Sequence, residues 1–373
     1  MTEKGLADVI AAQTAISDID GARGRLWYAG YDIHDLAQYS TFEETVFLLH
    51  QGRLPNRQEL EDLTERLVAE RDLDRFLGEL MPTFGEVTSP MSMLRTGISA
   101  SSAYDPDGWD QSAEANERKA VRLVARFPTL IAAYHRLRTG EEPVEPNPKL
   151  PHAANFLWML SAEEPDEEAA RAFDVCLVLH ADHTMNASTF TARVVASTLS
   201  DMHSAITAAI AALKGPLHGG ANEAVMKLLE EIGEVDRVEE VIRDRLGRKE
   251  KIPGFGHRVY RKVEDPRATH LRRLSRELGD RAGDTRWYDL SERIEKVLME
   301  DRGLYPNVDF YAASVYRYLG IPTDLMTCVF AASRVVGWSA HVREQLADNR
   351  LIRPESEYVG PRDQRYLPIE ERT

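Results

Sequence analysis

Apolar residues recur at helical spacing along most of this chain, and polar residues at helix-starting positions show where several helices begin. Ser40-Thr41-Phe42-Glu43 has the pattern of a capping box and opens the apolar run from Val46 to Leu49. Asn56 with Glu59 forms a second box, ahead of three leucines on one helix face. Two such starts within twenty residues predict a helical N-terminal half.

The same periodicity continues toward the C-terminus. It predicts helices over 118–138 with a kink at Pro128, over 167–180, 204–213 and 222–232, after a cap formed by Asp236 with Glu239, and over 323–347.

Extended segments are scarce in this pattern. Ile16 and Ile19 precede an Asp20-Gly21 turn, after which residues 26–28 can pair back as a second strand. Residues 140–151 carry four prolines among charges, which predicts a surface connection between helices. The predicted fold class is mainly α, with at most a small N-terminal β-ribbon.

Composition narrows the class of protein. The chain has 373 residues, of which 43% are hydrophobic and 29% charged, the balance of a globular protein with a sizeable core. Its net charge of -15 argues against a general nucleic-acid or membrane-surface partner, because such proteins usually present a basic face.

Cellular location is also predicted from the sequence. Cys176 and Cys328 both lie in apolar helical patterns, so we expect two buried thiols in a reducing cytoplasm rather than a disulfide or a thiolate metal site. No basic segment leads into an apolar run at the start, and no stretch approaches about 18 apolar residues. The sequence therefore predicts neither export nor membrane insertion.

Two histidines stand in glycine-rich turns. In GPLHGGAN, His218 lies between one helix end and a helix that Asn222 starts, and Gly219 and Gly220 leave room beside the imidazole. A neutral imidazole there is able to donate a hydrogen bond to a carbonyl that becomes an enolate. In PGFGHRVYRKVEDPR, His257 precedes a cluster of cations suited to phosphate or carboxylate, namely Arg258, Arg261, Lys262 and Arg267.

A candidate base follows in YPNVDFYA. Asn307 is placed to cap a helix, and Asp309 falls in its first turn among apolar neighbours. A poorly solvated carboxylate is a stronger base than an exposed one. The alternative interpretation is that Asp309 serves only as a partner of the helix dipole.

Two further segments carry polar groups in apolar surroundings. LHADHTMN places His180, Asp182 and His183 close together, which fits a polar pocket wall better than a metal site because no second ligand cluster matches it. Arg334 lies inside an apolar helix and needs an anionic partner, while Arg353 precedes Pro354. Several converging arginines indicate a ligand with more than one carboxylate.

These motifs together resemble the citrate synthase family of the compact bacterial and archaeal type. GPLHGGAN, PGFGHRVY with DPRA, YPNVDFYA, and ADH followed by NASTF match in order and spacing along essentially the whole chain. The resemblance implies an acyltransferase with an almost all-helical fold. It also implies a homodimer in which 1–215 with 320–373 form a large domain and 216–319 a small domain that closes over the substrates.

The same resemblance implies roles for individual residues. Asp309 matches the base that takes a methyl proton from acetyl-CoA, His218 the donor to the enol oxygen, and His257 the group that protonates the oxaloacetate carbonyl. Substrate carboxylates and CoA phosphates would be bound by other groups: His183, Arg267 and Arg334 for the carboxylates, Arg353 from the other subunit, and Arg258, Arg261 and Lys262 for CoA.

The resemblance implies acetyl-CoA as a co-substrate and no permanently bound cofactor or metal. This chain departs from the family pattern in one extra residue between His257 and Arg267, and in Thr184, where relatives usually have an acidic residue. It also lacks the N-terminal extension of larger hexameric relatives, so we expect a simple dimer.

Three alternatives to citrate synthesis stay open on the sequence. A 2-methylcitrate synthase would use propionyl-CoA, and the difference of one methylene is worth only about 1–3 kcal/mol in a pocket. A metal-dependent hydrolase would use His180, Asp182 and His183. A non-catalytic binding protein would keep the fold but lose His218, His257 or Asp309, which are all present.

Overall fold

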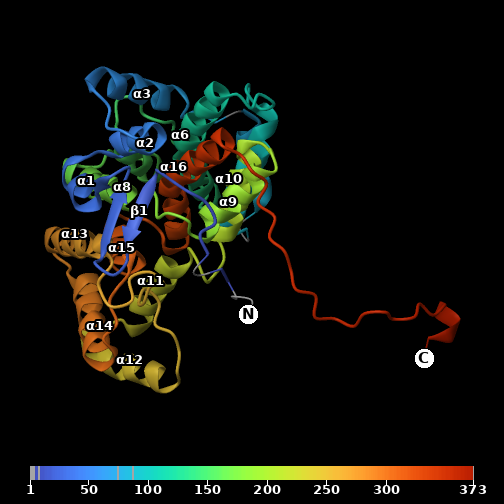
Figure 1. Ribbon diagram of the computed structural model, residues 1–373. Coiled ribbons are helices and arrows are strands. Elements are labelled where there is room, and N and C mark those ends of the chain that lie inside the picture. The colour runs from blue at the N-terminus through green and yellow to red at the C-terminus, as the bar shows by residue number, and fades with distance from the viewer. Residues whose placement is uncertain (1–4, 7–8, 74, 86–87, 373) are drawn as a thin grey trace.

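The computed structural model describes every residue except 1–4, 7–8, 74, 86–87 and 373 (Figure 1). Helices dominate the described residues, so the prediction of a mainly α fold is confirmed. The helices are α1 (Ile33–Tyr39), α2 (Phe42–Gln51), α3 (Arg57–Ala69), α4 (Arg75–Leu80), α5 (Pro90–Ser101), α6 (Ala113–Arg138), α7 (His152–Ser161), α8 (Glu167–His180), α9 (Ala187–Ser197), α10 (Met202–Leu213), α11 (Ala221–Ile232), α12 (Val238–Gly247), α13 (Pro266–Ala282), α14 (Arg286–Arg302), α15 (Val308–Tyr318) and α16 (Met326–Ala347).

The predicted N-terminal ribbon is present. Strands β1 (Ser17–Asp20), β2 (Arg25–Tyr28) and β3 (Tyr31–Asp32) form one antiparallel sheet in chain order. Asp20 pairs with Arg25, so the turn between β1 and β2 spans residues 21–24 rather than the two-residue turn that Asp20-Gly21 predicts. The turn at the end of this hairpin is thus longer than the sequence pattern indicates.

The helix starts test the capping predictions. Asn56 and Glu59 form the predicted box at α3. At α2 the box consists of Thr41 and Glu44, one residue later than predicted, because Thr41 is the residue that takes the extended backbone before the helix. The predicted cap of Asp236 with Glu239 is wrong.

A 3-10 turn over Val235–Arg237 leads directly into α12. No side chain caps the first turn of α12, and Glu239 instead pairs with Arg243 one helical turn later. A charge partner on the same helix face therefore replaces the predicted capping role.

Helix α16 runs through the middle of the larger group of helices (Figure 1), where it packs against α2, α6, α8, α9 and α10. With the 3-10 turn before it, Thr323–Ala347 is long and apolar enough to cross a membrane, contrary to the expectation that no stretch approaches this criterion. The whole apolar window is buried inside the protein, as in a core helix.

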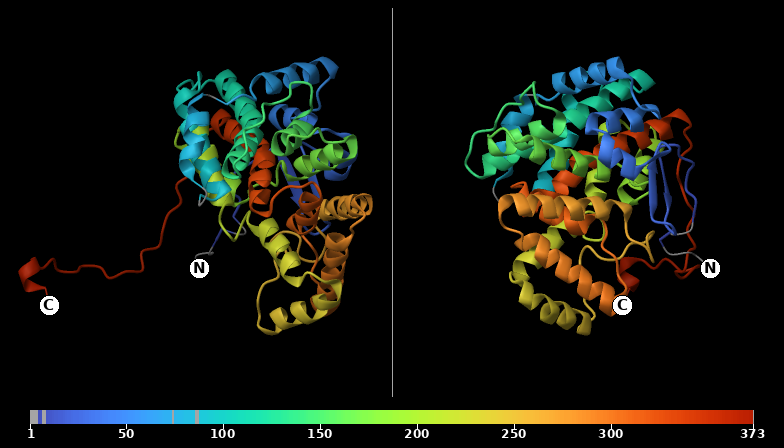
Figure 2. Two further views of the ribbon diagram at one scale, coloured as in Figure 1. Left: turned by 180° about the vertical axis from the view of Figure 1, so that it is seen from behind. Right: turned by 90° about the vertical axis from the view of Figure 1, so that its left-hand side faces the viewer.

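Helices α11 to α15 form a second group at one end of the molecule (Figures 1 and 2). Within it, α13 packs along α15, α11 packs on α15, and α12 packs on α14. The periodicity does not identify α13 and α14, because charged residues occupy much of both helices. This group supplies Arg267 from α13 and Asp309 from α15.

The chain after α16 leaves the body of the protein. Asn349 and Ile352 still bond to Ser197 at the end of α9, and the described chain beyond them runs as an extended segment that points away from the helices, with a 3-10 turn at Ile369–Glu371 (Figures 1 and 2). Val359 and Tyr366 on this segment are 90% and 81% exposed, although both are large apolar side chains. The Arg372 guanidinium lies over one side of the Tyr366 ring, 5.2 Å from its centroid, and most of both side chains stays exposed.

Candidate active site

His218 lies in the turn between α10 and α11, as predicted. The backbone N–H of Ser188, at the start of α9, donates to His218 Nε2 over 3.2 Å. Nε2 is therefore the accepting nitrogen, and the proton of the neutral ring is on Nδ1, which has no partner among the described residues. Burial and then the Arg334 charge lower the pKa of His218 to about 4, so the ring is neutral at neutral pH.

Two details of this turn differ from the prediction. A Cβ on Gly219 would come within 2.5 Å of Leu213 Cδ1 and 2.6 Å of its carbonyl oxygen. Gly219 is therefore needed for packing against the end of α10 rather than for space beside the imidazole. Asn222 does not start α11 either, because Gly220 is the N-cap and the Asn222 amide donates to Met326 O.

His257 lies in the loop that precedes α13. The backbone N–H groups of Val259 and Tyr260 donate to its Nδ1 over 3.0 and 3.3 Å. The proton of the neutral ring is therefore on Nε2, which is left as a donor. Burial lowers the pKa of His257 to about 4, with Asp265 opposing this and Arg267 adding to it.

His183 stands next to His257. Their rings are 5.2 Å apart between centroids, and His183 Nε2 is 3.2 Å from Tyr260 Oη. Burial holds the pKa of His183 well below its ordinary value, and the charges of Arg267 and Arg334 act in the same direction. The neutral His183 imidazole and the Tyr260 phenol therefore lie beside His257, within reach of the charges of Arg267 and Arg334.

Asp309 is in the first turn of α15, and Asn307 caps that helix as predicted. The Asp309 side chain is buried, its Oδ1 has no hydrogen-bond partner, and none of the described groups donates to its other oxygen. Burial raises the pKa of Asp309 to about 7, against the opposing charges of Arg267 and Arg334. The environment therefore produces a basic carboxylate with a free lone pair.

Arg267 is the second residue of α13 and is almost completely buried. Asp265 holds it through two bonds, from Nε over 2.9 Å and from Nη2 over 2.7 Å. The same carboxylate accepts the backbone N–H of Val308 at the start of α15. Although burial acts to lower the pKa of Arg267, the Asp265 charge holds it above its ordinary value, so the guanidinium stays charged.

Arg334 is buried in the middle of α16 and carries its charge without an ion pair among the described residues. Its Nε donates to His180 O over 2.6 Å, and the guanidinium lies over the Phe330 ring. Burial lowers the pKa of Arg334 to about 10, which still leaves it protonated at neutral pH. The remaining donors of a buried cation favour an anionic ligand.

The structure therefore brings together a carboxylate base, two neutral imidazoles with free N–H groups and two buried guanidinium groups. These residues come from α15, from the two predicted turns, from α13 and from α16. Such a set is able to remove a carbon-bound proton, to donate to two carbonyl oxygens and to bind carboxylates.

Comparison with known proteins gives the family. The family described as "Citrate synthase, C-terminal domain" matches residues 5–355. "Citrate synthase 2" of Bacillus subtilis is 51% identical over 370 residues, which covers 99% of each chain. This chain belongs to the citrate synthase family.

Two other relatives add detail to that assignment. "Citrate/2-methylcitrate synthase" of Bacillus subtilis is 45% identical, covering 96% of this chain and 97% of the relative. A solved citrate synthase from Thermoplasma acidophilum, a ternary complex with carboxymethyl coenzyme A and oxaloacetate, is 33% identical with a TM-score of 0.95 over all of both chains. The predicted two-group helical fold is therefore that of the citrate synthase family.

The cations that the family resemblance assigns to CoA lie on the surface beside His257. Arg258, Arg261 and Lys262 are exposed, and Arg261 Nε donates to Arg258 O over 3.1 Å. No acidic side chain pairs with any of the three among the described residues. They form a cationic loop at the edge of the site.

Arg353 does not join the site of its own chain. It is exposed on the extended segment after α16, which leads away from the helices (Figure 1). The structure thus separates Arg353 from the other predicted residues within one chain.

Asp182, His180 and His183 do not form a metal site. Ser17 Oγ, the Thr184 backbone N–H and the His341 ring all approach the Asp182 carboxylate. His180 Nδ1 is bonded to Cys176 O over 2.7 Å. Among the described residues no three potential ligands are grouped to hold a metal ion, so the alternative of a metal-dependent hydrolase loses its structural basis.

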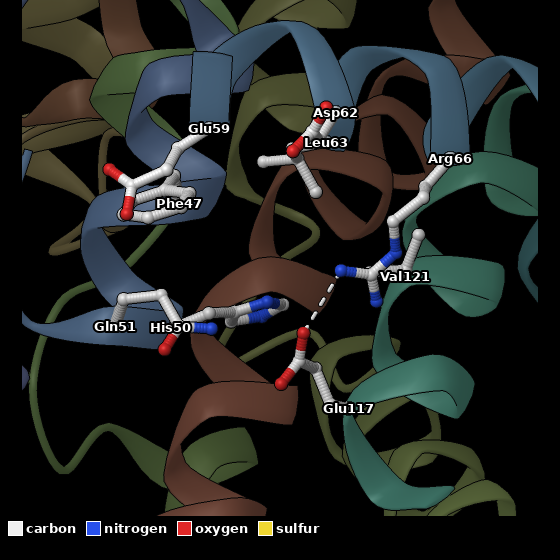
Figure 3. A pocket seen from close by; sticks show the side chains of 9 residues that line it. All are labelled: Phe47, His50, Gln51, Glu59, Asp62, Leu63, Arg66, Glu117 and Val121. Carbon is white, nitrogen blue, oxygen red and sulfur yellow. Dashed lines mark hydrogen bonds and ion pairs between the residues drawn. The ribbon is translucent and has the colours of Figure 1, made fainter. Parts of the chain in front are cut away.

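Two cavities elsewhere are not lined by any of these residues. One of about 200 Å³ lies between α2, α3 and α6, where the Arg66–Glu117 ion pair crosses it (Figure 3). The other, of about 640 Å³, lies between α1, α8 and α13. Sequence reasoning also missed Ser188, Tyr260 and Asp265, although Asp265 stands in the DPR segment two residues before Arg267.

Proposed function

We propose that this chain condenses oxaloacetate with acetyl-CoA and hydrolyses the resulting thioester to citrate and CoA. The observation that carries this proposal is the free oxygen of Asp309 in a site with two neutral imidazoles whose unbonded nitrogens are donors. A thioester α-proton is weakly acidic, so its removal requires a base and an electrophilic partner acting together.

The reaction begins at the methyl group of acetyl-CoA. Asp309 takes a methyl proton, and the Nδ1–H of His218 stabilises the enol oxygen that forms. The enol carbon then attacks the ketone carbon of oxaloacetate, and the Nε2–H of His257 supplies the proton for the new hydroxyl. Water then attacks the thioester carbonyl, which releases the CoA thiol and leaves citrate.

Binding is assigned to the remaining residues. Arg267, Arg334 and His183 bind the carboxylates of oxaloacetate, because buried cations need anionic partners. Arg258, Arg261 and Lys262 bind the phosphates of CoA, which is a co-substrate and not a resident cofactor. Residues 216–319 act as the small domain, which closes over both substrates.

A homodimer completes the site in this proposal. Val359 and Tyr366 are 90% and 81% exposed on a segment that extends away from the helices, which favours contact with a second copy. The segment then delivers Arg353 to the other subunit. Light scattering in solution tests the dimer, since a monomer or a hexamer would contradict it.

Complementation tests Arg353 directly. Asp309→Asn and Arg353→Ala chains are each expected to be almost inactive alone. Dissociating, mixing and reassociating them should recover about a quarter of wild-type activity, because half the dimers are mixed and one of their two sites is intact. No recovery, although mixed dimers are detected, would place Arg353 outside the partner's site.

The rate of free-thiol release from acetyl-CoA and propionyl-CoA, with and without oxaloacetate, tests the reaction. Oxaloacetate-dependent release with acetyl-CoA preferred supports citrate synthesis. Preference for propionyl-CoA would favour 2-methylcitrate synthesis, an activity named for one of the relatives above. Release without oxaloacetate, or no release with either thioester, would contradict the proposal.

A further inference from the structure

The tip of the β1–β2 hairpin packs against the loop that carries His257. A Cβ at Gly21 would lie 2.6 Å from Val259 Cγ1 and 2.7 Å from the Val259 carbonyl oxygen. Real side chains do not approach backbone atoms this closely, so the contact is available only to glycine. In Figure 1 the ends of the two strands reach toward the group of helices that contains α13 and α15.

A second glycine of the same turn meets the far end of this loop. Gly24 has φ +66°, and a Cβ there would lie 3.0 Å from the Glu264 carbonyl oxygen and 3.3 Å from Val263 Cγ2. These contacts fall within the stretch that is one residue longer than the family pattern. The far end of the loop therefore also lies against the hairpin turn.

Val259 links this contact to the site. Its carbonyl and side chain face Gly21, while its N–H donates to His257 Nδ1 over 3.0 Å. The next residue, Tyr260, also donates to Nδ1 and places its hydroxyl 3.2 Å from His183 Nε2. A displacement of Val259 thus moves the groups that fix the His257 tautomer and, through Tyr260, the His183 ring.

The rest of the loop is held at its other end. Glu264 pairs with Arg272 of α13, and its second oxygen accepts from Thr269 over 3.2 Å. Arg261 Nε donates to the carbonyl of Arg258 in the same loop, and no other described residue bonds to its side chain. None of these contacts involves Val259. Outside the loop, Val259 is contacted by the hairpin turn through Gly21.

We infer that residues 21–24 are a positioning element of the active site, which holds Val259 so that its N–H keeps the His257 proton on Nε2. This inference rests on the proposed function for the role of that proton. None of the turn residues touches substrate in this account. They act through the loop, and so they are positioning residues.

Gly21→Ala tests the contact, with Gly247→Ala as its control. Neither glycine has a positive φ, but a Cβ at Gly247 meets nothing within 4 Å. Gly21→Ala should lower kcat about tenfold or more through displacement of His257. The KM for oxaloacetate should rise by a smaller factor, because Arg267 and Arg334 are untouched and only His183 shifts with Tyr260. Gly247→Ala should keep the wild-type kcat.

Gly24→Ala and Gly30→Ala form a second matched pair. Both glycines have positive φ in the same sheet, so both variants carry similar backbone strain, but a Cβ at Gly30 meets nothing within 4 Å. Only Gly24→Ala should lower kcat. Equal losses in both variants would attribute the effect to strain and overturn the positioning role.

Nitrogen NMR of the His257 ring gives a readout that does not depend on turnover. The wild type should show a protonated Nε2 and an unprotonated Nδ1, and Gly21→Ala should show a mixture of tautomers or a second protonation. The His257→Asn spectrum assigns the signals. An unchanged His257 spectrum and unchanged kcat in folded Gly21→Ala would overturn the inference, whereas wild type without thiol release but with the predicted NMR change would contradict only the proposed function.

Discussion

Two buried aspartates of this protein, Asp182 and Asp309, differ in their hydrogen bonds and in the direction of their pKa shifts. Asp182, between α8 and α9, accepts from Ser17, Thr184 and His341. Asp309, in the first turn of α15, has no donor among the described residues. Burial alone raises the pKa of both carboxyls. The charge and hydrogen bond of His341, the charge of Arg334 and the Ser17 hydroxyl bring the pKa of Asp182 below its ordinary value, while that of Asp309 rises to about 7.

The comparison separates a structural carboxylate from a reactive one. Asp182 accepts all three donors on Oδ2, although its Oδ1 also has no hydrogen-bond partner, and the bond from the Thr184 N–H ties the carboxylate to the backbone beside His183. Asp309 keeps an unpaired oxygen, which is costly for folding and useful for taking a proton. The donors and charges around the two carboxyls, rather than burial, give them opposite pKa shifts, and the higher pKa makes Asp309 the stronger base.

The largest effect is expected from Asp309→Asn. An amide has nearly the shape of the carboxylate but does not take a proton, so turnover should fall by about 10²–10⁴ while oxaloacetate binding persists. Thiol release and isothermal titration with oxaloacetate measure the two properties. Near-normal turnover in the folded variant would remove Asp309 from the role of base.

Asp182→Asn should mainly lower stability, whereas Asp309→Asn should mainly lower turnover. Removing the charge leaves Ser17, Thr184 and His341 without a carboxylate partner, which should lower the free energy of unfolding by about 3 kcal/mol. Urea unfolding measures this change. A loss below about 1 kcal/mol would contradict the structural role of Asp182.

The pH dependence of stability should differ between Asp309→Asn and the wild type. The pKa of Asp309 is raised in the folded protein, so its contribution to stability is present below the ordinary pKa of 3.8 and is lost as pH rises through about 7. An amide does not titrate. The variant should therefore be more stable than the wild type near pH 8, by roughly 1 kcal/mol or more, and this difference should vanish near pH 4.

Urea unfolding of both proteins across this pH range checks the prediction. An advantage of the variant that is constant with pH would show that Asp309 is not protonated more readily in the folded state. Asp182 has a lowered pKa, so its own contribution is instead present above the ordinary range and lost as pH falls.

The smallest effect is expected from Ser17→Ala. It removes one of the donors to Asp182 and leaves Thr184 and His341 in place. The free energy of unfolding should fall by about 1 kcal/mol, and kcat should remain within about twofold of wild type. If the free energy of unfolding fell as much as in Asp182→Asn, Ser17 would stabilise the fold by more than its hydrogen bond to Asp182.

The sequence predicts local features of this protein better than long-range ones. The bounds of α8, the ribbon and the cap of α15 by Asn307 follow from nearby residues and agree with the structure. Helices α13 and α14 are missed because their charged residues obscure the apolar face. Local periodicity therefore suffices where one helix face is clearly apolar.

The site shows the same limit. His218, His257 and Asp309 stand in motifs that the sequence displays, and the structure brings them near one another. The donors that set their tautomers and pKa values come from elsewhere, such as the Ser188 amide, which is 30 positions from His218. Pairings of this kind depend on tertiary packing, which a pattern along one chain does not contain.

The most direct test of this account is the pH dependence of kcat/KM for acetyl-CoA at saturating oxaloacetate. If the undonated Asp309 carboxylate is the base, the rate should rise with pH through an apparent pKa of about 7, because the base acts only when deprotonated. A rate that is already maximal at about pH 5 would contradict the account, since it would place the essential base among carboxylates of ordinary pKa.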